Sequence, residues 1–281
     1  DSITVRNNLS QSTRYVYIKG FFNTSNSIDA PTGVGDGWHA ELRNVGQRTS
    51  ENERLYIRSW PGFDGGIDGN GSTNMCGFKM EDGGSYVTFR KLTFKNLANS
   101  APGSNKCYFL RTDSRSVFNH DHITCESLEV DGVVAGQEAA TAGWYSEGYC
   151  LGYKMWRCNL QNLSQSDLSQ MWGFESYSAA AVSIQRCTFG KMCEGVYEKQ
   201  PPSISGQVGF TIRFNYFDTG FTRFSSQGAL PMTNWGIVQS NIFHNPIEPP
   251  MRHFRTSPAS DSQKRWIVGN VIHNWQHGTL G

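Results

Sequence analysis

One short charged segment holds the residues best suited to acid–base chemistry. Its members, with the arginines that follow it, are Glu194, Tyr197, Glu198, Lys199, Arg213 and Arg223. β-Elimination of a uronate-containing polysaccharide needs a cation at the sugar carboxylate, a base for the C5 proton and an acid for the departing oxygen. Lys can be the base where its pKa is lowered, and Arg or a bound cation can neutralise the carboxylate. The segment therefore predicts Lys199 as the base, with Arg223 or Arg213 supporting the leaving group or the substrate carboxylate.

Aromatic and basic residues elsewhere fit the binding of an acidic sugar chain. Flat aromatic faces complement the C–H surfaces of pyranose rings. The candidate stacking residues are Trp144, Tyr145, Trp172 and Tyr197, and a basic group of Arg252, His253 and Arg255 suggests an anionic ligand. Two alternatives stay open, because such rings can also pack beneath loops and a basic loop can simply be solvated.

Paired carboxylates offer a rival chemistry, hydrolysis of a glycosidic bond. The pairs and triples available are Asp64 with Asp68, Glu81 with Asp82, and Glu126 with Glu129 and Asp131. Retaining glycosidases need carboxyl groups about 5 Å apart and inverting ones roughly 6.5 to 9.5 Å. Neighbouring chain segments can supply either distance, so a glycoside hydrolase is the enzymatic runner-up.

The elements that position these residues follow a repeated phrase: an apolar residue, two residues, a ladder residue, one residue and a second apolar residue. Eight copies begin at Ile57, Phe89, Cys125, Met155, Ile184, Ile212, Val238 and Ile267. Successive copies start 26 to 36 residues apart. A recurring unit of this length is typical of a stacked, quasi-one-dimensional fold.

Each copy has the features of short strands. The apolar positions alternate with period two, and the connections lack an amphipathic helix of about 10 residues or more, which a β-α-β unit would need. The shift after the ladder residue predicts a tight bend between two strands. Asn215, Asn241 and Asn270 occupy this position in three successive copies. Asn tolerates left-handed backbone angles and its amide can hydrogen-bond along a stack, so we expect the coils of a parallel β-helix.

The chain resembles the right-handed parallel β-helix superfamily typified by pectate lyases. The resemblance rests on the segments 55–62, 67–69 and 86–96, on the Asn ladder and on the Asn-x-Phe endings of later copies. It implies an all-β fold, a right-handed parallel β-helix solenoid of about eight or more coils over residues 54–281. Residues 1–53 do not fit the repeat and are expected to form an N-terminal cap and irregular opening coils.

A closer resemblance links the charged segment to the calcium-dependent alginate and dermatan lyases of this superfamily. Those enzymes place a calcium-ligating Glu shortly before a catalytic Lys, which implies that Glu194 and Glu198 hold calcium here. They also carry Arg-His-Gly on the next coil, whereas the segment 220–228 contains Arg223 without a following His.

Composition narrows the classes of partner. The formal net charge is +1, so no strong overall field points to nucleic acid, and no apolar run approaches the roughly 18 residues of a membrane-spanning helix. Four Asn-x-Ser/Thr sequons, at Asn8, Asn23, Asn70 and Asn162, favour an extracellular location.

Seven cysteines leave at least one thiol unpaired. Cys158 and Cys187 share the ladder position of adjacent copies, about 4.8 Å apart, which is compatible with either a disulfide or two stacked thiols.

Two functions remain. The first is a secreted, carbohydrate-active protein, a polysaccharide lyase acting on an acidic glycan. The second is a non-catalytic extracellular module, such as a spike, adhesin or filament subunit, in which the uncapped C-terminal end meets a further domain or subunit.

Overall fold

The computed structural model describes most of the chain as short strands. The residues described are 3–6, 13–23, 37–43, 48–69, 75–81, 84–97, 107–113, 120–132, 141–163, 172–190, 194–200, 210–218, 223–225, 235–245, 251–252 and 264–274. Apart from one 3₁₀ turn, η1 (Glu51–Glu53), every regular element in these ranges is a β-strand. The all-β prediction is therefore confirmed.

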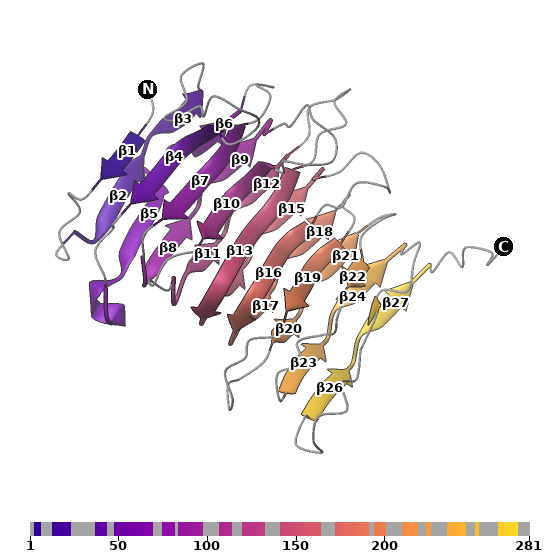
Figure 1. The fold of residues 1–281 in the computed structure, drawn as a ribbon. Coiled ribbons are helices and arrows are strands. Elements are labelled where there is room, and N and C mark those ends of the chain that lie inside the picture. The colour runs from indigo at the N-terminus through magenta and orange to yellow at the C-terminus, as the bar shows by residue number, and fades with distance from the viewer. Residues whose placement is uncertain are drawn as a thin grey trace.

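The strands form three parallel sheets, each of nine strands, which the chain visits in turn (Figure 1). Sheet A contains β1 (Ile3–Arg6), β4 (Gly37–Arg43), β7 (Met75–Glu81), β10 (Cys107–Asp113), β13 (Thr141–Leu151), β16 (Trp172–Ala180), β19 (Glu194–Gln200), β22 (Arg223–Ser225) and β25 (Met251–Arg252). Sheet B contains β2 (Tyr15–Ile18), β5 (Leu55–Ser59), β8 (Val87–Arg90), β11 (Thr124–Glu126), β14 (Lys154–Trp156), β17 (Ser183–Gln185), β20 (Thr211–Arg213), β23 (Trp235–Gln239) and β26 (Lys264–Val268). Sheet C contains β3 (Gly20–Asn23), β6 (Gly65–Asp68), β9 (Thr93–Lys95), β12 (Glu129–Asp131), β15 (Asn159–Gln161), β18 (Thr188–Gly190), β21 (Tyr216–Asp218), β24 (Ile242–His244) and β27 (Val271–His273). This is a parallel β-helix.

The region expected to be an irregular cap contributes to all three sheets. Strands β1, β2 and β3 pair in parallel with β4, β5 and β6. These first three strands extend the stack by one unit beyond the eight repeated phrases.

The period-two pattern of each strand separates a buried face from an outer face. In β5, Leu55 and Ile57 are buried, whereas Tyr56 and Arg58 are partly exposed. Identical residue types then stack from coil to coil. The rings of Phe189, Phe217 and Phe243, for example, are stacked at 4.9 and 4.8 Å between centroids. The core is therefore a set of such columns along the axis.

The bend between sheets B and C differs in one detail from the prediction. The Asn side chains form the expected ladder: the Asn241 Nδ2 group donates to the carbonyl of Ile212 at 3.0 Å and to Asn270 Oδ1 at 2.9 Å. The left-handed backbone angle, however, belongs to the residue before the ladder position. Those residues, with φ between 51° and 57°, are Lys91, Ser127, Arg157, Arg186, Phe214 and Ser240. The ladder Asn faces the core and keeps an ordinary φ.

Cys158 and Cys187 stack as free, buried thiols, so the disulfide alternative is not formed. The Cys158 Sγ atom lies 3.4 Å from the carbonyl oxygen of Cys125, and the Cys187 Sγ atom lies 3.3 Å from that of Gln185. Each thiol donates to a backbone carbonyl, a weak hydrogen bond available to a buried SH group.

The last described coil exposes its apolar residues. The most exposed of them are Trp266, Ile267, Val268, Val271 and Ile272, at 42 to 54%. Within the described ranges, no helix has the length and apolar character needed to cross a membrane.

Candidate functional site

Sheet A brings together most of the residues that the sequence assigns to chemistry. Glu194 of β19 has Trp172 of β16 as its register partner on one side and Arg223 of β22 on the other. Their adjacency is a consequence of the repeat, because residues one coil apart lie about 4.8 Å from each other.

A second row of sheet A contains Tyr145, Glu175 and Tyr197 as successive register partners. The Tyr145 ring stacks on Tyr108 at 4.7 Å, and the Arg111 guanidinium lies over it at 5.4 Å. Glu175 is only 2% exposed although it belongs to the row of Tyr145.

Tyr108, Arg111 and Glu175 belong to this cluster although the sequence did not predict them. The repeated phrase covers sheets B and C, while the strands of sheet A follow connections of variable length. One feature of the sequence could have indicated Glu175: it is the one charged residue in the segment 172–180.

Lys199 lies where the register shifts. Glu198 pairs with Ser176 and Gln200 pairs with Tyr177, so Lys199 is the extra residue of a β-bulge. Bulges are over-represented next to active sites because they redirect one side chain out of the regular alternation. This backbone feature distinguishes Lys199 from the other lysines of the described strands.

The predicted stacking role of Trp144 is wrong. Its side chain is 1% exposed and packs against the rings of Tyr153 and Phe174, at 4.6 and 5.3 Å. The indole N–H donates to Thr112 Oγ1 at 3.2 Å. Burial also raises the pKa of the Tyr153 phenol well above its usual value. Trp144, Thr112 and Tyr153 are therefore part of the core. Tyr145, the residue after Trp144, remains partly exposed.

The basic residues divide among three positions. Arg213 lies in β20 of sheet B, so it does not share a sheet with Lys199. Arg252 lies in β25 of sheet A, where it pairs with Ser225. His253 and Arg255 lie outside the described residues.

The calcium prediction concerns two residues of one strand. Glu194 and Glu198 are four residues apart on β19, which corresponds to about 13 Å along an extended strand. Glu198 also occupies the register position of Ser146 and Ser176, both fully buried, whereas Glu194 falls in the row of Trp172 and Arg223. Calcium ligands must all lie about 2.3 to 2.6 Å from the ion. Among the described residues no group of three His, Cys, Asp or Glu side chains could hold a metal.

Several carboxylates proposed for hydrolysis are used between coils. Asp68 binds Lys95 at 3.2 Å, and Glu126 binds Arg90 at 3.3 Å. Glu129 accepts a hydrogen bond from the side chain of Asn159 at 2.8 Å. These contacts stabilise the stack and give the three carboxylates a structural role.

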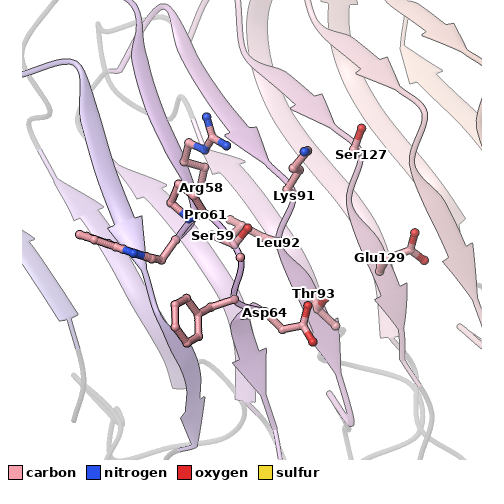
Figure 2. A pocket seen from close by; sticks show the side chains of 12 residues that line it. Arg58, Ser59, Pro61, Asp64, Lys91, Leu92, Thr93, Ser127 and Glu129 are labelled. Atoms are coloured by element: carbon pink, nitrogen blue, oxygen red, sulfur yellow. The ribbon is translucent and has the colours of Figure 1, made fainter.

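A hollow of about 460 Å³ lies on the bend between sheets B and C in the early coils (Figure 2). It is lined by both aromatic and polar side chains, including Arg58, Trp60, Phe63, Asp64, Lys91 and Glu129. Trp60 and Phe63 are half exposed, at 48 and 50%. The sequence placed Trp60 only as part of a repeated phrase, because nothing local indicates that a bend residue borders a cavity.

Comparison of the chain with family models, with curated proteins and with solved structures found no match. The structure thus supports the parallel β-helix part of the predicted resemblance, and no family match supports the part that concerns pectate or alginate lyases.

Proposed function

We propose that this protein is a secreted, carbohydrate-active β-helix that cleaves an acidic polysaccharide by β-elimination on sheet A. The observation that carries the proposal is the β-bulge at Lys199 beside the row of Tyr145, Glu175 and Tyr197. It combines an amine, phenols and a partly exposed aromatic ring on one sheet, and a sugar chain can lie across parallel strands of this kind.

In this scheme Lys199 removes the C5 proton. Tyr197, two residues away and about 7 Å along the strand, protonates the departing oxygen. A phenol is a competent general acid where it reaches the leaving group.

Arg223 is better suited to the carboxylate of a neighbouring sugar. Its register partner Glu194 is five residues from Lys199, which is about 16 Å along the strand.

The test is the ultraviolet absorbance of the unsaturated uronate product, with alginate, pectate, dermatan sulfate and ulvan as separate substrates. Lys199→Ala and Tyr197→Phe are expected to lower kcat by about 100-fold or more, the usual contribution of a general base or acid. Arg223→Gln is expected to raise KM with a smaller effect on kcat.

Arg213→Gln is the matched control, because this arginine lies on sheet B. Equal losses in Arg213→Gln and Arg223→Gln would contradict the assignment of the site to sheet A. Each assay is run with added calcium and with EDTA. Cleavage that disappears in EDTA and returns with calcium would support the calcium role predicted for Glu194 and Glu198.

A second candidate is the non-catalytic module, favoured by the exposed apolar residues of the last coil. Absence of product from all four substrates, together with self-association that Ile272→Asp abolishes, would support this function instead.

A further inference from the structure

The bend between sheets B and C is a continuous backbone ladder along the molecule. The N–H of Lys91 donates to the carbonyl of Glu126, that of Ser127 to Trp156, and that of Arg157 to Gln185. These donors are the residues with left-handed backbone angles, and each sits one coil from the next. Side chains at this position therefore form a row along the axis with a spacing of about 4.8 Å.

The aromatic hollow lies at one end of this row. Lys91 and Ser127 line it together with Trp60 and Phe63 (Figure 2). Arg58 and Lys91 supply positive charge, and Asp64 supplies an acceptor for hydroxyl groups. An exposed indole next to hydrogen-bonding groups of both signs suits a sugar ring.

Cations continue the row beyond the hollow. Arg157 and Arg186, both exposed, occupy the two bend positions that follow Ser127. Their guanidinium groups lie 5.7 and 5.2 Å from the centre of the Trp156 ring, and Lys154 Nζ lies 5.1 Å from it. Three cations therefore gather around one partly exposed indole.

Within this group, Lys154 interacts electrostatically with the carboxylate of Glu51. Within the described ranges, Lys91, Arg157 and Arg186 form no ion pair. Glu126, the register neighbour of Trp156, is paired with Arg90. Like charges held close together without counter-charges favour an anionic ligand.

We infer that this bend, from Trp60 to Arg186, binds an extended acidic polysaccharide at a site separate from sheet A. A sugar stacks in the Trp60 hollow, and carboxylate or sulfate groups farther along the chain meet Lys91, Arg157 and Arg186. The track spans four coil steps, or about 19 Å. Single-stranded nucleic acid also combines rings and anions, so it is included in the test as a competing polyanion.

The inference concerns binding alone and does not depend on cleavage at sheet A. It is tested by isothermal titration of the full chain with polygalacturonate, alginate and dermatan sulfate, with cellohexaose as neutral glycan and single-stranded DNA as competing polyanion. Lys199→Ala is used as background so that no substrate is consumed. If the unmodified chain binds a glycan and the Lys199→Ala variant does not, the ligand is held on sheet A.

Trp60→Ala is expected to weaken binding of at least one acidic glycan by about 10-fold, which corresponds to about 1.4 kcal/mol. Its control is Trp266→Ala, which removes an equally exposed indole, also 48%, from the last coil. Arg186→Gln is expected to weaken binding by about threefold, within the range of an exposed ion pair. Its control is Lys95→Gln, which removes one positive charge from sheet C.

Three results would overturn the inference. They are equal losses in a variant and its control, tighter binding of DNA than of every acidic glycan, and no binding of any acidic glycan. Glycan can bind at the bend even if the product assay detects no cleavage on sheet A. The proposal of cleavage and the inference of binding can therefore fail independently.

Discussion

Residues that are adjacent in the sequence have unrelated roles when a strand separates its two faces. Trp144 and Tyr145 both have the size and aromatic character for sugar binding, and the sequence predicted both. The strand places Trp144 in the core and leaves Tyr145 partly exposed. Composition cannot distinguish them, because the distinction depends on the register of β13, which no short pattern around it specifies.

Trp144→Ala and Tyr145→Ala separate these roles. Trp144→Ala is expected to lower the free energy of unfolding by about 3 to 5 kcal/mol, since it leaves a cavity beside Tyr153 and Phe174. Tyr145→Ala should cost much less stability and should raise KM on an acidic glycan. Chemical denaturation measures the first effect and the product assay the second. A larger loss of stability in Tyr145→Ala would contradict the assigned faces.

At the scale of elements, the strands of sheets B and C were predictable and those of sheet A largely were not. The seven repeated phrases from Phe89 onward locate β8 to β27 in sheets B and C because each of their bends has two residues. Sheet A follows connections of different lengths, so the bulge at Lys199 and the row through Glu175 emerge only from the register. The catalytic candidates lie on the sheet about which the sequence said least.

At the bend, the left-handed backbone angle of Phe214 carries a conformational free-energy cost that can be measured. Phe214 has a φ of 57° and a side chain that is 52% exposed, so it gains little from burial to offset a left-handed backbone. Phe214→Asn is expected to raise the free energy of unfolding by up to about 1 kcal/mol, because Asn tolerates this region.

Gly269 is the counterpart in the same row, with a φ of 63°. Gly269→Ala is therefore expected to destabilise by about 1 kcal/mol. Thermal denaturation compares the two variants. Shifts of the same sign would mean that side-chain contacts, and not backbone angles, decide stability at the bend.

At the scale of the whole molecule, the buried thiols of the core make the free energy of unfolding depend on pH in the alkaline range. Burial raises the pKa of Cys125, Cys150 and Cys187. Because the folded pKa exceeds the unfolded value of about 8.5, the neutral thiols stabilise fully below that pH. The stabilisation is lost as pH rises, because the unfolded chain then releases protons that the folded chain retains.

The free energy of unfolding is expected to fall by at most about 4 kcal/mol between pH 7.5 and 9.5, about 1.4 kcal/mol for each thiol. Denaturation at the two pH values measures this difference within one variant. Cys187→Ala should reduce the difference by about a third. A pH response unchanged in that variant would assign the effect to other groups.

The backbone ladder at the bend has a consequence for how the rod can change in length. Because the coils from Lys91 to Ser240 are joined by the same bend hydrogen bond, distances along this part of the axis come in whole steps of about 4.8 Å. Duplication of a complete coil between Ser127 and Arg157 would move the hollow and the Trp156 cations apart by one step along the axis. The number of coils between the hollow and the Trp156 cations thus sets the length of ligand that can contact both.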